Sequence, residues 1–360
     1  PPMSSDLPIR PGLLGAEPYG APTDPVPVRL NVNENPYSPP PEVVAAITAA
    51  VAGVAGEMNR YPDREALTLR QSLAEYVGVT ADRIWPANGS NEIMQQILGV
   101  FGGPGRTVLS FAPTYSMYPV YARDSHTRYV TAGRRPDHSL DPDVVARALA
   151  DEQPSVVVVA SPNNPTGGVI SSDEVVDLHD RVAPAGVLVV DEAYVEFAPD
   201  GSSAVQLLDA LPNLIVTRTM SKAWGMAGLR LGYAVTSPAI VAALRIVRLP
   251  YHLSAISQAA AVAALTHRAQ LLAPVSEVVH ERDRFQEWLA ARGIPFTPSE
   301  ANFVLIGPLP DAHGVFTDLL ADGVLIRETG GPGYLRASIG TPDENAELRR
   351  ALASAWEGQT

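Results

Sequence analysis

The chain has 360 residues, of which 46% are hydrophobic and 18% charged, values typical of a globular protein with one large core and a second, smaller one. Its 26 lysines and arginines against 39 acids give a net charge of −13, which disfavours a nucleic-acid or anionic-membrane surface. Because the chain contains no cysteine, disulfides, thiolate metal sites and cysteine nucleophiles are excluded.

The first part of the chain is irregular, and a regular alternation of elements follows it. Residues 1–40 form an N-terminal arm whose first 29 residues are rich in proline and glycine. Helices are expected over 41–52, 65–77, 90–101, 114–122 and 141–150, and strands over 106–110, 127–131, 155–160, 186–191, 213–218 and 231–235. Continuous apolar strands suit a sheet buried on both faces, so the pattern predicts an α/β domain with a mainly parallel sheet.

The character of the chain changes after about residue 250. Long helical patterns over 254–290 precede shorter strands over 303–306, 324–327 and 334–339, and a final helix is expected over 343–356. This order predicts a smaller α+β domain. The expected organisation is therefore an arm over 1–40 that partly joins the small domain, a large domain over 41–250 and a small domain over 251–360.

Lys222 is the only lysine, so the other 25 of the 26 basic residues are arginine. Arginine stays protonated in proteins, whereas a lysine amine can lose its proton and attack a carbonyl. A single lysine therefore indicates a position where arginine cannot serve. The alternative is a stray surface lysine in an arginine-rich composition.

The apolar run 187–190 ends in Asp191 and Glu192, at the strand end where α/β sheets place ligands. A P-loop ATPase would also have such a strand, but it requires a glycine-rich loop before the lysine, and none precedes Lys222. A pyridine-type cofactor needs a buried carboxylate beside its ring nitrogen, and Asp191 can supply it. Tyr194 could donate its hydroxyl to the ring oxygen of such a cofactor. The loop 161–167 follows another apolar strand and could reach the same edge, although alone it is an ordinary turn.

A phosphate site is indicated where Gly89 precedes the helical run that starts at Ser90 and Asn91. Free amides at a helix start, with the helix dipole behind them, favour an anion. An ordinary serine N-cap is the alternative. Ser221 and Arg230 flank the lysine and could complete a phosphate cup.

Together these motifs resemble the fold-type I, pyridoxal-phosphate-dependent aminotransferases of class II and, among them, the histidinol-phosphate aminotransferase family. The resemblance covers about residues 19–340, and its motifs stand in order along the chain. The matching stretches are 30–37, 60–63, 88–92, 112–115, 161–167, 191–194, 219–230, 249–254, 324–327 and 335–336. Ser38 and Trp224 depart from the residues common in the family, at positions without an assigned chemical role.

The resemblance implies a fold-type I large domain with a mainly parallel seven-stranded sheet flanked by helices. It also implies a role for individual residues, with Lys222, Asp191 and Tyr194 as the catalytic set. Lys222 would bond covalently to pyridoxal 5'-phosphate and carry a proton, and Asp191 would pair with the ring nitrogen. The resemblance implies that Asn164 and Tyr194 contact the ring oxygen of the cofactor and that Tyr115 stacks on the ring. The implied phosphate contacts are Ser90, Asn91, Ser221 and Arg230. Tyr61 would reach the same phosphate from the partner subunit of a homodimer.

The implied reaction converts L-histidinol phosphate and 2-oxoglutarate to imidazole-acetol phosphate and L-glutamate in histidine biosynthesis. Arg336 would grip the anionic end of either substrate, because one guanidinium fork suits both a carboxylate and a phosphate ester. The other substrate candidates are Arg327, Tyr19, Asn35 and Tyr251.

Three alternatives stay open at this point: an aromatic amino-acid aminotransferase on the same scaffold, a different reaction of the same cofactor, and a sensor without activity. A sensor usually carries a DNA-binding segment, for which 360 residues are expected to leave no room. The histidines show no metal-binding spacing, so no metal is expected. No apolar run of membrane-spanning length and no signal peptide is visible, so we expect a cytoplasmic protein without a membrane partner.

Overall fold

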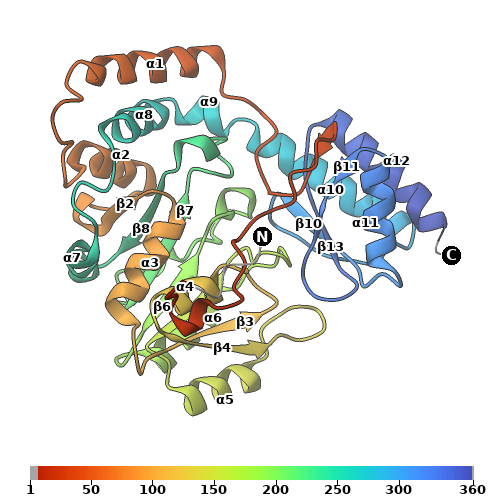
Figure 1. Ribbon diagram of the computed structural model, residues 1–360, viewed down its shortest axis with the longest axis horizontal. Helices are drawn as coiled ribbons and strands as arrows, with labels where there is room; N and C mark the ends of the chain where they lie inside the picture. Colours follow the sequence, from red (N-terminus) through yellow and green to blue (C-terminus); the bar gives the residue numbers. More distant parts are fainter. Residues whose placement is uncertain (1–6, 359–360) are drawn as a thin grey trace.

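The computed structural model describes residues 7–358 and has two lobes (Figure 1). The large lobe contains a seven-stranded sheet, and the small lobe contains a four-stranded antiparallel sheet. The order of the small sheet is β12 (Arg327–Glu328), β13 (Leu335–Ser338), β10 (Phe303–Ile306) and β9 (Phe296–Thr297). The outermost residues of the predicted arm and small domain, 1–6 and 359–360, lie outside the described part of the chain.

The large sheet has the order β2-β8-β7-β6-β5-β3-β4. Pairing is antiparallel on both sides of β8 and parallel elsewhere, so β8 alone runs against the other strands. The strands are β2 (Ile84–Ala87), β3 (Thr107–Ala112), β4 (Arg128–Gly133), β5 (Val156–Ala160), β6 (Val187–Asp191), β7 (Leu214–Thr219) and β8 (Gly232–Thr236). This architecture confirms the predicted α/β fold with a mainly parallel seven-stranded sheet.

Alternating side chains of the central strands enter two separate hydrophobic cores, because successive residues of a strand face opposite sides of the sheet. Val156 and Val158 join one core, whereas Val157 and Val159 join the other. The first core is covered by α3 (Ser90–Phe101), α4 (Tyr118–Asp124) and α7 (Pro238–Val247). The second is covered by α2 (Leu67–Val77), α5 (Pro142–Glu152), α6 (Ser172–Val182) and α8 (Ala255–Thr266). Burial on both faces explains the continuous apolar strands.

Several elements differ from the prediction for local reasons. Strand β2 was missed because it contains Pro86, which a sheet tolerates at its edge, where β2 lies. Helix α6 was also missed, although Ser171 and Glu174 form a capping box at its start. The helix expected over 114–122 begins only at Tyr118, with Pro119 in its first turn, which leaves Thr114 and Tyr115 in the preceding loop.

The small lobe follows the long helical region, which is divided into α8, α9 (Arg268–Leu272) and α10 (Val275–Ala291). Pro274 precedes α10, where a proline ends one helix and permits the next. The remaining elements are β9 (Phe296–Thr297), β10 (Phe303–Ile306), α11 (Ala312–Ala321), β11 (Val324–Leu325), β12 (Arg327–Glu328), β13 (Leu335–Ser338) and α12 (Pro342–Glu357). Helices α11 and α12 pack against each other beside this sheet (Figure 1).

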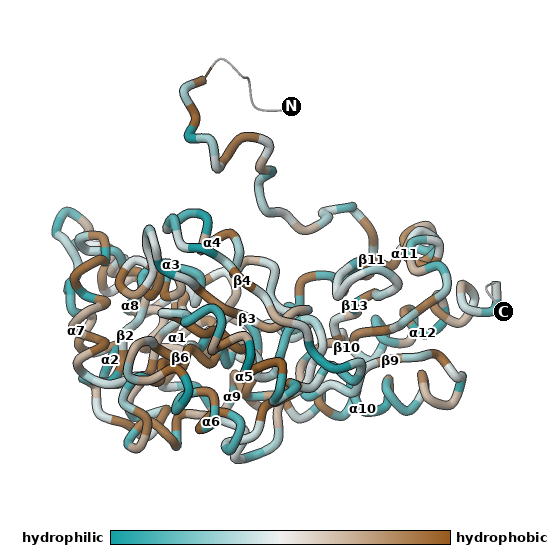
Figure 2. Tube along the Cα trace, turned by 90° about the horizontal axis from the view of Figure 1, so that it is seen from below, coloured by the Kyte–Doolittle hydropathy of each residue, from teal (hydrophilic) through white to brown (hydrophobic). Residues whose placement is uncertain are grey.

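Helix α8 packs against α1 (Pro41–Ala55) and α2, so it lies with the large lobe although it begins after residue 250. The domain boundaries stay predictions, but this helix belongs spatially to the large lobe. The arm protrudes from the two lobes over its first described residues in Figure 2, whereas Leu30, Asn31 and Asn33 near its end are buried. It contains the short helix η1 (Pro11–Leu13), and its strand β1 (Val28–Arg29) pairs with β11, which joins the arm to the small lobe.

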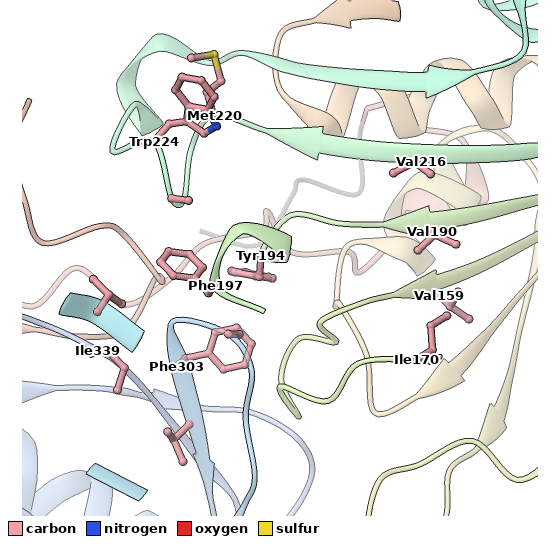
Figure 3. Packing of buried hydrophobic residues seen from close by; sticks show 14 of the residues in the cluster. Val159, Ile170, Val190, Tyr194, Phe197, Val216, Met220, Trp224, Phe303 and Ile339 are labelled. Atoms are coloured by element: carbon pink, nitrogen blue, oxygen red, sulfur yellow. The ribbon is translucent and has the colours of Figure 1, made fainter. Parts of the chain in front are cut away.

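The two lobes share a hydrophobic contact beside the sheet edge (Figure 3). Tyr194 follows β6 of the large lobe, and its ring meets Phe303 of β10 edge to face, with the ring centres 5.0 Å apart. Both side chains are buried. The loop that follows Asp191 is therefore held by apolar packing against the small lobe.

Candidate active site

A cavity of about 1030 Å³, including its open mouth, lies between the lobes at the carboxyl ends of β3, β5, β6 and β7. Parallel sheets place ligands at this edge because the strand ends and the following loops meet there. The structure brings most of the predicted site residues together here: Tyr19, Ser90, Asn91, Tyr115, Asn164, Asp191, Tyr194, Ser221, Lys222, Arg230, Arg327 and Arg336.

Lys222 faces the cavity from the loop after β7, and it is only partly exposed. Its amine donates a hydrogen bond of 2.9 Å to the carbonyl of Val32 and lies 5.9 Å from the ring centre of Tyr194. Burial, together with the positive charges of Arg336 and Arg230, lowers the pKa of Lys222 to about 8. The amine is therefore much more often uncharged near neutral pH than an ordinary lysine, as a nucleophile requires.

Asp191 is the last residue of β6, and its carboxylate is buried at the floor of the cavity. The Tyr118 hydroxyl donates to Oδ2 at 2.9 Å, and the Thr217 hydroxyl donates to Oδ1 at 3.2 Å. Burial raises the pKa of Asp191, while these two hydrogen bonds act in the opposite direction. A buried carboxylate of this kind is costly unless a cation approaches it.

Four buried side chains form a hydrogen-bonded chain at the cavity. Arg336, on β13 of the small lobe, donates from Nη1 to Asn164 Oδ1 at 2.6 Å. Asn164 Nδ2 in turn donates to the Tyr194 hydroxyl at 3.4 Å, and Asn33 Nδ2 donates to the same hydroxyl at 3.0 Å. The Nε atom of Arg336 is buried and makes no hydrogen bond with the described residues. The Arg336 guanidinium is therefore held at the cavity wall, and its Nε–H donor has no partner among the described residues.

The start of α3 and the loop after Lys222 form a cup. Gly89 precedes α3 with a φ of 85°, and no side chain caps the first amides of the helix. The Arg230 guanidinium donates to the Ser221 hydroxyl at 3.2 Å. A side chain at Gly89 would come within 2.8 Å of Arg230 Nη2, and one at Gly232 would clash with the Ser90 amide. Both glycines keep the amides and the guanidinium facing the same space, which suits a phosphate.

The mouth of the cavity is lined by Tyr19 from the arm and by Arg327 from β12. The Arg327 guanidinium lies 5.9 Å from the ring centre of Tyr19, a cation–π contact that links the arm to the small lobe. Tyr115 also lines the cavity, and its ring meets that of Tyr118 edge to face, with the ring centres 5.5 Å apart.

Three predicted residues do not line this cavity. Asn35 uses its side chain locally, because it donates to the carbonyl of Ala223 and accepts from the amide of Tyr37. Tyr61 and Tyr251 stack on each other, with ring centres 4.3 Å apart, and their side chains are exposed. Asn35 therefore holds the loop after Lys222, and its substrate role stays a prediction. The partner-subunit role of Tyr61 and the substrate role of Tyr251 stay predictions.

Several residues of the site were not singled out from the sequence. They are Asn31, Val32 and Asn33 of the segment after β1, together with Thr114, Ser116, Tyr118, Thr217, Thr219 and Thr329. The polar cluster 31–35 between the arm and α1 was a visible signal, but nothing in it distinguished Asn33 from Asn35. Tyr118 stands three residues after Tyr115 in an apolar helical pattern and is indistinguishable there from a packing residue.

Two further kinds of site are absent from residues 7–358. No group of three or more histidines and acids lies close enough to hold a metal ion. No helix combines the length and apolar character needed to cross a bilayer.

The fold and the cavity, with its single lysine opposite a buried carboxylate, define an enzyme of the aminotransferase class. Residues 25–352 match the family model described as aminotransferase class I and II, and the chain belongs to this family. It is 52% identical to the histidinol-phosphate aminotransferase of Thermobifida fusca over 353 residues, which cover 97% of this chain and 96% of that one. It is 50% identical to that of Corynebacterium glutamicum, with coverage of 97% and 96%.

A solved structure shows the same fold. The histidinol-phosphate aminotransferase of Sinorhizobium meliloti, in complex with pyridoxal-5'-phosphate, superposes with a TM-score of 0.84 at 28% identity and covers 93% of this chain and 92% of its own. This similarity confirms the predicted fold-type I architecture.

Proposed function

We propose that the chain transfers the amino group of L-histidinol phosphate to 2-oxoglutarate, giving imidazole-acetol phosphate and L-glutamate, with pyridoxal 5'-phosphate bound in the cavity. One observation carries this proposal. The only lysine of the chain shares a cavity with a buried carboxylate, an anion cup at a helix start and a buried arginine. The names of the close relatives point to the same reaction.

The residues present fit this cofactor. The cup between Gly89, Ser90, Ser221 and Arg230 offers amides, a hydroxyl and a guanidinium to a phosphate. The buried carboxylate of Asp191 suits a protonated ring nitrogen, because a cation there would compensate its lost hydration. When bound, the cofactor supplies an electron-withdrawing ring that stabilises negative charge next to the amino carbon.

Lys222 would hold the cofactor covalently and then carry a proton between two carbon atoms. Its lowered pKa lets the amine accept and release that proton near neutral pH. Asp191 would keep the ring nitrogen charged. Tyr194 and Asn164 would donate toward the ring oxygen, since both reach the same point in the cavity. Tyr115, which also lines the cavity, would stack on the ring.

Arg336 would bind the anionic end of each substrate in turn. Its guanidinium is fixed by Asn164 and by the carbonyl of Asn31, to which it donates at 2.8 Å, so the fork is oriented before a substrate arrives. A pre-oriented fork can grip either the carboxylate of glutamate or the phosphate of histidinol phosphate. Arg327 and Tyr19 at the cavity mouth would contact the remainder of the substrate.

The active unit would be a homodimer with shared sites. Large apolar side chains are exposed near the stacked pair of Tyr61 and Tyr251: Tyr61 is 80%, Ile246 83% and Leu249 71% exposed. Exposed apolar side chains in one region are typical of a subunit interface. Tyr61 would then reach the phosphate cup of the partner. The cytoplasmic location expected from the sequence stays a prediction.

A spectral titration tests the reaction. The purified protein with bound cofactor should absorb at about 400–430 nm, where a lysine-linked cofactor absorbs, and lose this band on amino transfer. Histidinol phosphate should remove the band at a lower concentration than phenylalanine, and 2-oxoglutarate should restore it with formation of glutamate. If phenylalanine removed the band at a lower concentration than histidinol phosphate, the result would instead favour an aromatic amino-acid aminotransferase.

Mixing two inactive variants tests the shared site. In a dimer of one Lys222→Ala and one Tyr61→Ala subunit, one site combines an intact Lys222 with an intact Tyr61 of the partner subunit. Activity should therefore rise above that of either variant alone. If the mixture is no more active than the mean of its components, Tyr61 does not act across the interface.

A further inference from the structure

Tyr118 lies in the first turn of α4, behind the wall of the cavity, and it has no role in the function proposed above. Its side chain is only 1% exposed, yet its hydroxyl donates to Asp191 Oδ2 at 2.9 Å. A hydroxyl buried among apolar residues is costly unless it is hydrogen-bonded. Tyr118 belongs to the same hydrophobic core as Ile93, Ile97 and Val189.

The same tyrosine also contacts a second residue of the site. Its ring meets that of Tyr115 edge to face, with ring centres 5.5 Å apart and an angle of 87° between the rings. Tyr115 lines the cavity, whereas Asp191 lies at its floor. One rigid, fully buried side chain thus fixes both the carboxylate and the aromatic wall.

We propose that Tyr118 is a positioning residue that holds Asp191 and Tyr115 in place on two sides of the cofactor ring. The proposal rests on the proposed function, because it assumes that Asp191 meets the ring nitrogen. Thr217 of β7 assists by donating to the other carboxylate oxygen at 3.2 Å. Each carboxylate oxygen then has one side-chain donor, which favours the charged form and fixes its orientation.

The surroundings of Asp191 favour its protonated form, so the hydrogen bonds from Tyr118 and Thr217 are needed to keep it charged. Glu192 follows directly and disfavours ionisation of its neighbour, as burial also does. The opposing contributions come from Tyr118, Thr217 and the backbone amide of Ala193. Without the tyrosine hydroxyl, Asp191 would hold a proton more readily, and the ring nitrogen would hold its own less firmly.

Helix α4 provides a matched control. Tyr121 lies one turn after Tyr118, is 2% exposed and belongs to the same core, but its hydroxyl faces that of Tyr115 and makes no hydrogen bond to Asp191. Tyr118→Phe and Tyr121→Phe therefore each remove one buried hydroxyl from the same helix and the same core. Only the first removes a donor from Asp191. Thr217→Val removes the other side-chain donor with little change of shape.

The test is a pH titration of the visible absorbance of the full-length holoenzyme, together with kcat and KM. For Tyr118→Phe, the pH midpoint should move upward, because less positive charge on the ring leaves the proton on the Lys222 nitrogen more tightly bound. The kcat should fall about tenfold, the effect of one hydrogen bond to a charged group, with KM within about twofold. Thr217→Val should shift the midpoint in the same direction, and Tyr121→Phe should leave it unchanged.

Equal shifts in Tyr118→Phe and Tyr121→Phe would mean that packing, and not the hydrogen bond, is responsible, and would overturn the proposal. An unchanged midpoint in Tyr118→Phe would do the same. If Tyr118→Phe does not fold, an unchanged midpoint in Thr217→Val decides against the proposal. A wild-type protein without any visible band would instead contradict the proposed function, so the two failures are distinguishable.

Discussion

Arg336 and Asn164 are joined by a hydrogen bond of 2.6 Å that links the small lobe to the large lobe across the cavity. Asn164 also donates to the Tyr194 hydroxyl, so the residue proposed to bind substrate and the residues proposed to bind the ring oxygen form one network. The relative position of the two lobes therefore determines how Arg336 faces the other residues of the cavity.

Replacement of Arg336 by glutamine should raise the KM for both substrates by about 10- to 100-fold, because it removes charge-assisted hydrogen bonds to an anion. The kcat should change much less, since the grip is the same in the ground and transition states. Steady-state kinetics with histidinol phosphate and 2-oxoglutarate would measure both constants. Arg350→Gln, at an exposed position on α12, is the control. Normal KM values in Arg336→Gln would show that another residue binds the anionic end.

The residues proposed for covalent or charge chemistry could be singled out from the sequence, because each stands in a motif, and the structure brings them into one cavity. Lys222 is the only lysine, Asp191 ends an apolar strand, and Ser90 starts a helix after a glycine. The residues that hold them were not predictable in this way. Tyr118 and Thr217 reach Asp191 only through the tertiary structure, across 73 and 26 residues of sequence. The strand β2 was hidden by its proline, although the positions of the neighbouring strands were predicted to within two residues.

The lowered pKa of Lys222 should control how fast the protein binds its cofactor covalently. Burial, and after it the charge of Arg336, lowers this pKa from 10.5 to about 8. Only the neutral amine attacks an aldehyde, so the rate of covalent binding to the cofactor-free protein should rise with pH and level off above about pH 8. Stopped-flow absorbance after mixing with pyridoxal 5'-phosphate would measure this rate.

Two comparisons test the assignment of this pKa. A model peptide with an exposed lysine should show a plateau only near its ordinary pKa, and Arg336→Gln should move the plateau of the protein to higher pH. The contribution of Lys222 to the free energy of unfolding should change with pH in the same direction as the binding rate. Between pH 8 and 10.5 the unfolded chain binds a proton that the folded chain does not, so the contribution of Lys222 to stability rises with pH. A wild-type plateau near pH 10 would contradict a buried amine.

Gly232 should be essential for the phosphate cup. A side chain there would clash with the Ser90 amide, so Gly232→Ala should displace the start of α3 and weaken cofactor binding by at least about tenfold. Equilibrium dialysis or fluorescence titration with the cofactor would measure the dissociation constant. Gly228→Ala is the matched control in the preceding loop, because a side chain there would meet no atom within 4 Å. Equal affinity in the two variants would exclude a role for the Ser90 amide.

The ion pair between Glu192 and Arg218 should stabilise the folded protein. Glu192 is fully buried and accepts from Arg218 Nε at 3.0 Å, from the Ser203 hydroxyl at 2.9 Å and from the Ala204 amide at 2.6 Å. Glu192→Gln removes the carboxylate that is hydrogen-bonded to the buried Arg218 cation, which should lower the free energy of unfolding by about 3 kcal/mol. Denaturant unfolding of the cofactor-free protein would measure the change.

Glu347→Gln serves as the control, because Glu347 pairs with Arg350 at 2.9 Å on the surface of α12, where an ion pair contributes little. The double variant Glu192→Leu/Arg218→Met should recover much of the stability lost in Glu192→Gln, since it removes both charges together. The double variant should not recover full activity. Glu192 directly follows Asp191, and Arg218 precedes Lys222 by four residues. The ion pair therefore connects the two strands that carry the proposed catalytic groups. Equal stability of Glu192→Gln and Glu347→Gln would show that the buried pair contributes no more than a surface one.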